Sequence, residues 1–145
     1  MIFLDTNVIS ESLRKAPDPR VLDWLIRYDA EFALPSITIG EVASGICKIR
    51  PDQRADRLAK GLDEWRHRFA DRIFPSTEAA AMAYGEIMGD RIKQGKPMSA
   101  QDGMIAAIVR INKGILATRN VDDFKDIPHL DLINPWDFGR SLPNN

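Results

Sequence analysis

Four short segments of the sequence carry acidic side chains suited to metal-dependent chemistry. Asp5 follows the first apolar run in MIFLDTN, and Glu41 ends the IGE that follows the second. Asp102 lies in SAQDGM, and Asp122 and Asp123 lie in ATRNVDDF. Carboxylates gathered at one place repel one another, and a hard divalent cation relieves that repulsion through the oxygen ligands it prefers. If these acids meet, they predict a site for Mg²⁺ or Mn²⁺.

Each of these acids also has a structural interpretation. Asp5 can cap the helix that follows it, and Ser99 with Asp102 has the spacing of a capping box. At least one of the paired aspartates in VDDF fits a solvated turn. Glu41 is the hardest to explain structurally, because its neighbours in the sequence are apolar. The choice between the two interpretations depends on where the fold places the acids.

Short apolar segments alternate with helical ones along the chain. We expect strands at 2–4, 32–34, 72–74, 115–117 and 131–133. We expect helices at 7–14, 19–28, 38–49, 53–70, 78–94 and 100–112. This alternation predicts an α/β protein with a mostly parallel sheet covered on both faces.

The acidic segments fall at the strand ends of this predicted sheet. Asp5 ends the first strand, Glu41 lies about one turn into the helix after the second, and Asp123 follows the fourth. Asp102 lies near the start of an apolar helix. Ligands of open parallel sheets bind at the carboxyl ends of the strands. We therefore expect the acids to meet at one edge of the sheet.

Composition narrows the possible functions. The 145 residues fit a single domain spanning 1–145, and the net charge of -1 predicts that any contact with nucleic acid is local or mediated by a metal. The single Cys47 lies in an apolar helical stretch, where we expect a small core residue in a reducing cytoplasm. We see neither a signal peptide nor an apolar run long enough to span a membrane.

Taken together, the motifs resemble those of a known family. LDTN with VISE, IGE, SAQDGMIAA, ATRNVDDF and the closing INPW are similar to the motifs of PIN-domain ribonucleases, in particular the VapC and FitB-like toxins of bacterial type II toxin-antitoxin modules. The resemblance runs from Met1 to about Phe138. It implies a three-layer α/β/α sandwich and a Mg²⁺- or Mn²⁺-dependent endoribonuclease. It also implies a homodimer and a small cognate antitoxin, through which a larger assembly would bind operator DNA.

The resemblance also assigns residues. Asp5, Glu41 and Asp102 match the family's three acidic positions. The fourth position, acidic in some members, is Asn120 here, so Asp123 is an alternative source of the fourth charge. Thr118 matches a polar position that helps to hold the site. The implied catalytic residues are Asp5, Glu41, Asp102, Asp123, Thr118 and Asn120, and the implied metal ligands are Asp5, Asp102, Glu41 and Asp123.

Two further functions stay open at this point, and so do the contacts with partners. The chain could be a PIN-like binding module without catalysis, or a haloacid-dehalogenase-like phosphatase, although the latter needs a second acid where Asn7 stands. Arg14, Lys15 and Arg119 are candidates for contacts with the RNA backbone. An arginine of a disordered antitoxin tail could pair with the acids, while the rest of the tail lies on apolar surface near 7–28 and 38–49.

Overall fold

The five strands form one parallel sheet. The computed structural model describes residues 1–140, so residues 141–145 of the predicted domain lie outside the described part. The strands pair in the order β3-β2-β1-β4-β5, and every pair is parallel. Their bounds are β1 Ile2–Leu4, β2 Phe32–Pro35, β3 Ile73–Phe74, β4 Ile115–Ala117 and β5 Asp131–Ile133.

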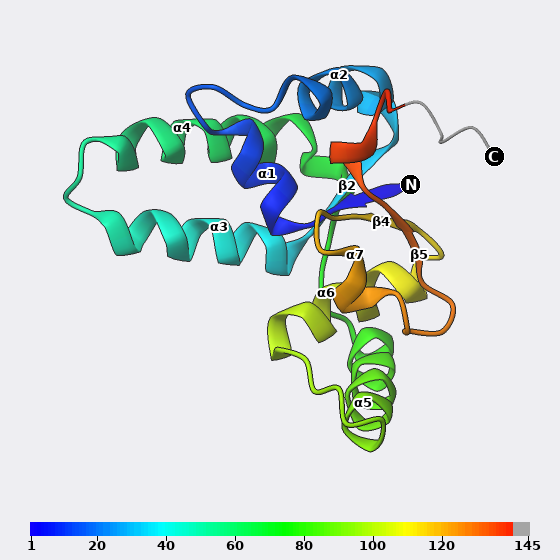
Figure 1. The fold of residues 1–145 in the computed structure, drawn as a ribbon. Coiled ribbons are helices and arrows are strands. Elements are labelled where there is room, and N and C mark those ends of the chain that lie inside the picture. Colours follow the sequence, from blue (N-terminus) through cyan, green and yellow to red (C-terminus); the bar gives the residue numbers. More distant parts are fainter. Residues whose placement is uncertain (141–145) are drawn as a thin grey trace.

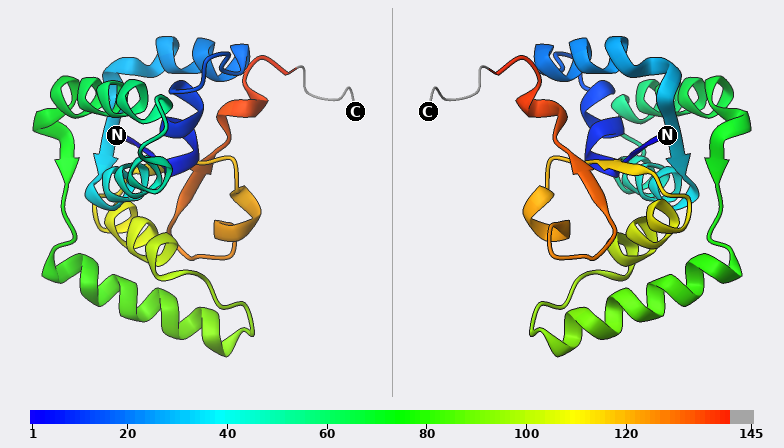
Figure 2. Two further views of the ribbon diagram at one scale, coloured as in Figure 1. Left: turned by 90° about the vertical axis from the view of Figure 1, so that its left-hand side faces the viewer. Right: turned by 90° about the vertical axis from the view of Figure 1, so that its right-hand side faces the viewer.

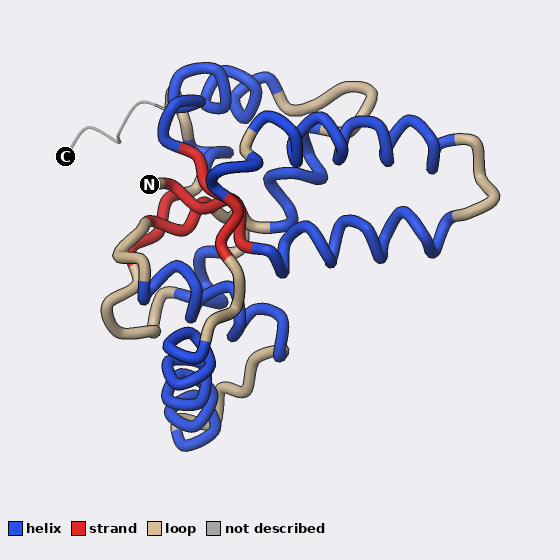
Figure 3. Tube along the Cα trace, turned by 180° about the vertical axis from the view of Figure 1, so that it is seen from behind, coloured by secondary structure: helices blue, strands red, loops and turns tan. Residues whose placement is uncertain are grey.

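Helices cover both faces of this sheet, as Figures 1 and 3 show. The α-helices are α1 Thr6–Ser12, α2 Pro19–Tyr28, α3 Ser36–Ile49, α4 Arg54–Arg68, α5 Glu78–Lys93, α6 Ala100–Ile111 and α7 Val121–Phe124. Three 3₁₀ helices, η1 Asp29–Glu31, η2 Ala70–Arg72 and η3 Pro135–Asp137, complete the described elements. The predicted three-layer α/β/α architecture with a parallel sheet is confirmed.

The alternation of side chains along the strands creates two hydrophobic cores. Ile2 and Leu4 belong to the core under α1 to α4, whereas Phe3, between them, belongs to the core under α5 and α6. Leu116 and Ala117 divide between the cores in the same way. Successive strand residues point to opposite faces, so three apolar residues in a row serve both layers. These strands can therefore be short and still be buried.

Two helix pairs extend from the sheet. In Figure 1, α3 and α4 form an antiparallel pair that projects to one side, and Figure 2 shows α5 crossing the opposite end of the molecule beside α6. An apolar stripe along α4 and its C-cap packs against the first core, with Leu62 and Phe69 buried and Leu58 and Trp65 partly buried. The indole of Trp65 donates a hydrogen bond to Ser12 Oγ at 3.0 Å, which ties α4 to α1.

Most element boundaries differ from the predicted ones by one or two residues, and two expectations were wrong. The short helix α7 was missed, because its four residues are too few to show a helical period. Cys47 is exposed and is not a core residue. The buried face of α3 consists of Thr38, Val42 and Ile46, and Cys47 lies one residue, or about 100°, beyond that face.

No helix in the described part of the chain combines the length and the apolar composition that a membrane span requires.

Candidate functional site

The carboxylate of Asp5 lies at the end of β1 and is only 4% exposed. As the N-cap of α1, it accepts a hydrogen bond from Thr6 N at 2.8 Å. Its second oxygen accepts from Thr118 Oγ1 at 2.7 Å and from Asn7 Nδ2 at 3.3 Å. Three donors therefore fix this buried carboxylate, which is both the helix cap and a member of the candidate site.

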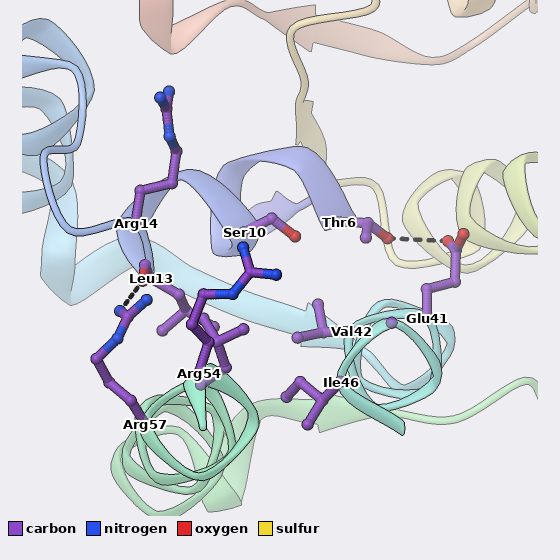
Figure 4. Close-up of a pocket in the computed structure, with 11 residues that line it drawn as sticks. Thr6, Ser10, Leu13, Arg14, Glu41, Val42, Ile46, Arg54 and Arg57 are labelled. Atoms are coloured by element: carbon purple, nitrogen blue, oxygen red, sulfur yellow. Dashed lines mark hydrogen bonds between the residues drawn. The ribbon is translucent and has the colours of Figure 1, made fainter. Parts of the chain in front are cut away.

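Glu41 lies in the second turn of α3, beside α1. Its Oε1 accepts a hydrogen bond from Thr6 Oγ1 at 2.9 Å, as Figure 4 shows. The helix itself is anchored to the sheet, because Thr38 Oγ1 donates to Leu4 O at 3.0 Å. The carboxylate of Glu41 is thus held near the end of β1, although 36 residues separate it from Asp5 in the sequence.

Asp102 lies in the first turn of α6. Ser99 caps this helix by accepting a hydrogen bond from Asp102 N at 3.1 Å, which is one of the two hydrogen bonds of the predicted capping box. The next residue, Gly103, lets α6 approach α5 closely, since a Cβ there would lie 2.5 Å from Met88 Sδ and 3.1 Å from a ring carbon of Tyr84. The cap and the close packing orient Asp102, while its half-buried carboxylate keeps the site open to solvent.

The fourth segment connects β4 to α7. Thr118 is fully buried, and its hydroxyl oxygen accepts from Asn7 Nδ2 at 3.3 Å and from Asn120 N at 3.0 Å while it donates to Asp5. Asp123 N donates to Asn120 O at 3.0 Å, and the Asp123 side chain is exposed. Thr118 therefore positions its neighbours, because a side chain without exposed surface cannot contact a substrate.

The acids influence one another. Burial raises the pKa of the Asp5 carboxyl above its usual range, and the charge of Glu41 adds to the rise, whereas hydrogen bonds from Thr118, Thr6 and Asn7 oppose it. Burial likewise raises the pKa of Asp102, and the charges of Asp5 and Asp123 raise it further. We call Asp5, Glu41, Asp102 and Asp123 the acidic edge, since the fold brings all four close enough for these effects.

The acidic edge suits a hard cation. Within residues 1–140, no three Asp, Glu, His or Cys side chains converge as a ready-made metal cage. Mg²⁺ does not need one, because it keeps several waters and is commonly bound through one or two carboxylates plus substrate phosphates. Burial first, and then the charges of neighbouring carboxylates, raise the pKa of Asp5 and of Asp102, and a divalent cation bound beside them would oppose both effects.

Next to the acidic edge lies a groove of about 470 Å³ between α1, α3 and α4 (Figure 4). Thr6 and Glu41 line it at one end, so the groove and the acidic edge share Glu41. The remaining groove residues include apolar side chains from α3, from α4 and from the C-cap of α1, together with three arginines: Leu13, Val42, Ile46, Leu58, Arg14, Arg54 and Arg57. The groove is therefore apolar along its length, and the carboxylate of Glu41 and the guanidinium groups of the arginines lie on different sides of it.

Thr6 and Asn7 were not among the predicted site residues. Thr6 joins Asp5 to Glu41, and Asn7 joins Asp5 to Thr118 while its Oδ1 accepts from Arg119 N at 3.2 Å. Their position directly after Asp5 in LDTN was the available signal. Arg14, a candidate for RNA contact, forms an ion pair with the buried Glu11.

We expect Asp102→Asn to leave the melting temperature of the metal-free protein unchanged or to raise it by up to about 3 °C, roughly the effect of 1 kcal/mol in a domain of this size. The folded pKa of Asp102 lies above that of the unfolded chain, so its ionised form opposes folding at neutral pH. This penalty disappears as the pH falls through the raised pKa, and the variant should lack that part of the pH dependence. Thermal melts in EDTA between pH 4 and 8 measure both effects.

Asp131→Asn is the matched control. Asp131 is exposed and is the first residue of β5, so it lies at the amino ends of the parallel strands, whereas the acidic edge lies at their carboxyl ends. A clear drop in melting temperature for Asp102→Asn alone would show that the carboxylate serves the helix cap and not the acidic edge.

Comparisons with known proteins show the family to which this fold belongs. The model of the PIN domain family matches residues 2–130. The chain is 36% identical over 138 residues to toxin FitB from Neisseria gonorrhoeae and 34% identical over 142 residues to the VapC ribonuclease Y4jK from Sinorhizobium fredii. In both cases the match covers 94% of this chain and 99% of the relative.

Solved structures give the same result. The crystal structure of FitAcB from Neisseria gonorrhoeae superposes with a TM-score of 0.84 at 35% identity, covering 94% of this chain and 99% of the other. VapBC2 from Rickettsia felis, bound to a DNA fragment from the promoter, gives a TM-score of 0.80 at 26% identity, covering 92% and 98%. The chain belongs to the PIN-domain family, in the group of toxin-antitoxin proteins that includes FitB and VapC.

Proposed function

We propose that this protein is the toxin of a type II toxin-antitoxin module and that it hydrolyses RNA phosphodiesters in the cytoplasm as a Mg²⁺- or Mn²⁺-dependent endoribonuclease. The observation that carries the proposal is the acidic edge, in which Asp5 at the end of β1, Glu41 in the second turn of α3, Asp102 in the first turn of α6 and Asp123 in α7 lie close enough for neighbouring charges to act on one another. Such an arrangement is unfavourable in a protein without a cation, and it suits phosphodiester hydrolysis with one.

Asp5 and Asp102 would hold the metal most directly, with Glu41 and Asp123 binding it directly or through water. When bound, the ion would neutralise charge on the scissile phosphate and lower the pKa of a water molecule. Thr6, Asn7 and Thr118 are positioning residues. Their hydrogen bonds fix the oxygens of Asp5 and Glu41, so the carboxylates need no rearrangement when the substrate binds.

The proposal includes protein partners. A small cognate antitoxin would bind in the groove between α1, α3 and α4, and the toxin would act as a homodimer that reaches operator DNA through the antitoxin. The apolar lining of the groove suits the apolar face of a helix, and its acidic end suits an arginine of the partner beside Glu41. This arrangement would place the inhibitor next to the acidic edge.

The deciding experiment is an RNA cleavage assay with purified protein in Mn²⁺ and in EDTA. We expect cleavage in Mn²⁺ only and a loss of at least about 100-fold for Asp5→Asn, because losing a direct ligand should cost more than the roughly 10–100-fold lost with a group that only orients a ligand. Asp131→Asn, which removes a charge from the far end of β5, should retain activity. Folded wild-type protein that binds RNA without cutting it in any divalent metal would identify a binding module instead.

The fourth acidic position can be assigned by two substitutions. We expect Asp123→Asn to reduce cleavage more than Asn120→Ala, because the charge of Asp123 acts on Asp102 and a carboxylate binds Mg²⁺ better than an amide. Asp122→Asn, next to it on α7, is the control and should have the smallest effect. The opposite order, with Asn120→Ala the most damaging, would assign the fourth position to Asn120.

The docking site of the antitoxin can be tested by filling the groove. Gly45 lines the groove, and a Cβ there would meet nothing within 4 Å, so Gly45→Met should fold normally and occupy the space that the partner needs. We expect the affinity for the antitoxin, measured by calorimetry, to fall about tenfold or more, which corresponds to 1.4 kcal/mol. RNA cleavage should persist.

Gly40→Met is the control, because Gly40 lies on the same helix, is equally open and does not line the groove. Equal antitoxin affinity for both variants and the wild type would place the docking surface elsewhere.

A further inference from the structure

We infer that Arg119, stacked over the ring of Trp136, binds a phosphate of the RNA beside the one that is cleaved. The inference rests on the proposed ribonuclease function and deepens it, because it names a contact with the substrate outside the acidic edge. Arg119 lies between Thr118 and Asn120 in the segment that connects β4 to α7. Its guanidinium carbon is 5.1 Å from the centre of the Trp136 ring.

The backbone of Arg119 is fastened to the acidic edge. Its N–H donates to Asn7 Oδ1 at 3.2 Å, and the amide of Asn7 donates to Asp5 Oδ2 at 3.3 Å. The residue on each side is fixed as well, since Asn120 N donates to Thr118 Oγ1 at 3.0 Å. The base of the arginine side chain therefore has a defined position one side chain away from the most buried carboxylate of the site.

The stack on Trp136 also restricts the rest of the side chain. Trp136 lies in η3, is 5% exposed and belongs to the first hydrophobic core, so its ring is a firm support. A guanidinium over an aromatic face is attracted to the ring and keeps its edge free for hydrogen bonds. An exposed arginine that is already restrained loses less conformational entropy when it binds a phosphate than a freely rotating one does.

The charge of Arg119 is also available for a ligand. Within residues 1–140, Arg119 forms no ion pair. Most other arginines in this part of the chain pair with carboxylates: Arg14, Arg20, Arg50, Arg54, Arg66, Arg68, Arg110 and Arg140. Arg119 thus belongs to the minority of arginines in residues 1–140 that have no carboxylate partner, and it lies in the segment that carries Thr118 and Asn120.

The substrate requires such a group. The acidic edge repels the phosphates that flank the scissile one, and a metal bound there compensates only the charge close to it. The whole chain has a net charge of -1 and provides no general attraction for RNA. A fixed arginine at the rim supplies a local attraction, and its planar fork matches the two oxygens of a phosphate.

The test compares Arg119→Ala with wild type on a fluorescent single-stranded RNA oligonucleotide in Mn²⁺. We expect KM to rise about tenfold with kcat nearly unchanged, because a phosphate contact remote from the reacting atoms is made equally in the ground state and in the transition state. The slope of log kcat/KM against log salt should become shallower by about 0.7, the value for one lost phosphate contact on a single strand. Arg119→Lys keeps the charge without the planar stack and should give an intermediate KM.

The matched control is Lys113→Asn. It removes the same charge from the opposite end of β4, at a position with φ 53°, which asparagine tolerates. Binding of the same oligonucleotide by fluorescence anisotropy in an Asp5→Asn background gives a readout that does not depend on cleavage. There, Arg119→Ala should weaken binding and Lys113→Asn should not.

Three results would overturn the inference. One is an unchanged KM and an unchanged salt slope for Arg119→Ala. If Asp5→Asn still abolishes cleavage, this result would exclude the phosphate contact and leave the proposed ribonuclease function intact. Another is an equal effect of Lys113→Asn, which would reduce the contact to general charge. The third is weaker binding of the antitoxin with unchanged binding of RNA, which would assign Arg119 to the protein partner.

Discussion

The hydrogen bond of 2.7 Å from Thr118 to Asp5 is the interaction on which the rest of the site depends. It joins the ends of β1 and β4, which pair in parallel with Leu4 opposite Ala117, so the two side chains emerge next to each other. A carboxylate that is 4% exposed is costly unless donors surround it, and here Thr6, Asn7 and Thr118 all donate. These donors orient the carboxylate without neutralising it. The carboxylate is therefore already oriented in the protein without a cation, and it keeps the charge that the proposed cation would bind.

The fold provides this arrangement with very short elements. A parallel strand of three residues can be buried only if both faces are covered, and the two cores separated by the sheet meet that condition. The helices that carry Glu41 and Asp102 are fixed by contacts at their starts, through Thr38 for α3 and Ser99 for α6. Contacts that anchor the helices thus lie beside the site, while like charges within it oppose folding. Active sites commonly combine these two features.

The sequence predicted the strands, the layers and the edge at which the acids gather, because these follow from hydrophobic period and from the rule for parallel sheets. It did not predict the partners of the acids. Asn7 and Thr118 are 111 residues apart, and Thr6 and Glu41 are 35 apart, so no local pattern connects them. The exposure of Cys47 depends on which face of α3 is buried. The sequence of a mostly apolar helix does not show which face that is. The stack of Arg119 on Trp136 likewise depends on the path of the chain after β5.

Glu41 belongs to both the acidic edge and the groove, and Thr6, which holds it, lines the groove as well. If the antitoxin binds in that groove, as proposed, one pair of side chains would serve both the proposed reaction and its restraint. Natural selection then could not easily separate the two. A change at Thr6 or Glu41 that weakened the inhibitor would also disturb the carboxylates of the acidic edge. In a toxin that acts on its own cell, this overlap would make mutants rare that keep the activity and no longer bind the inhibitor.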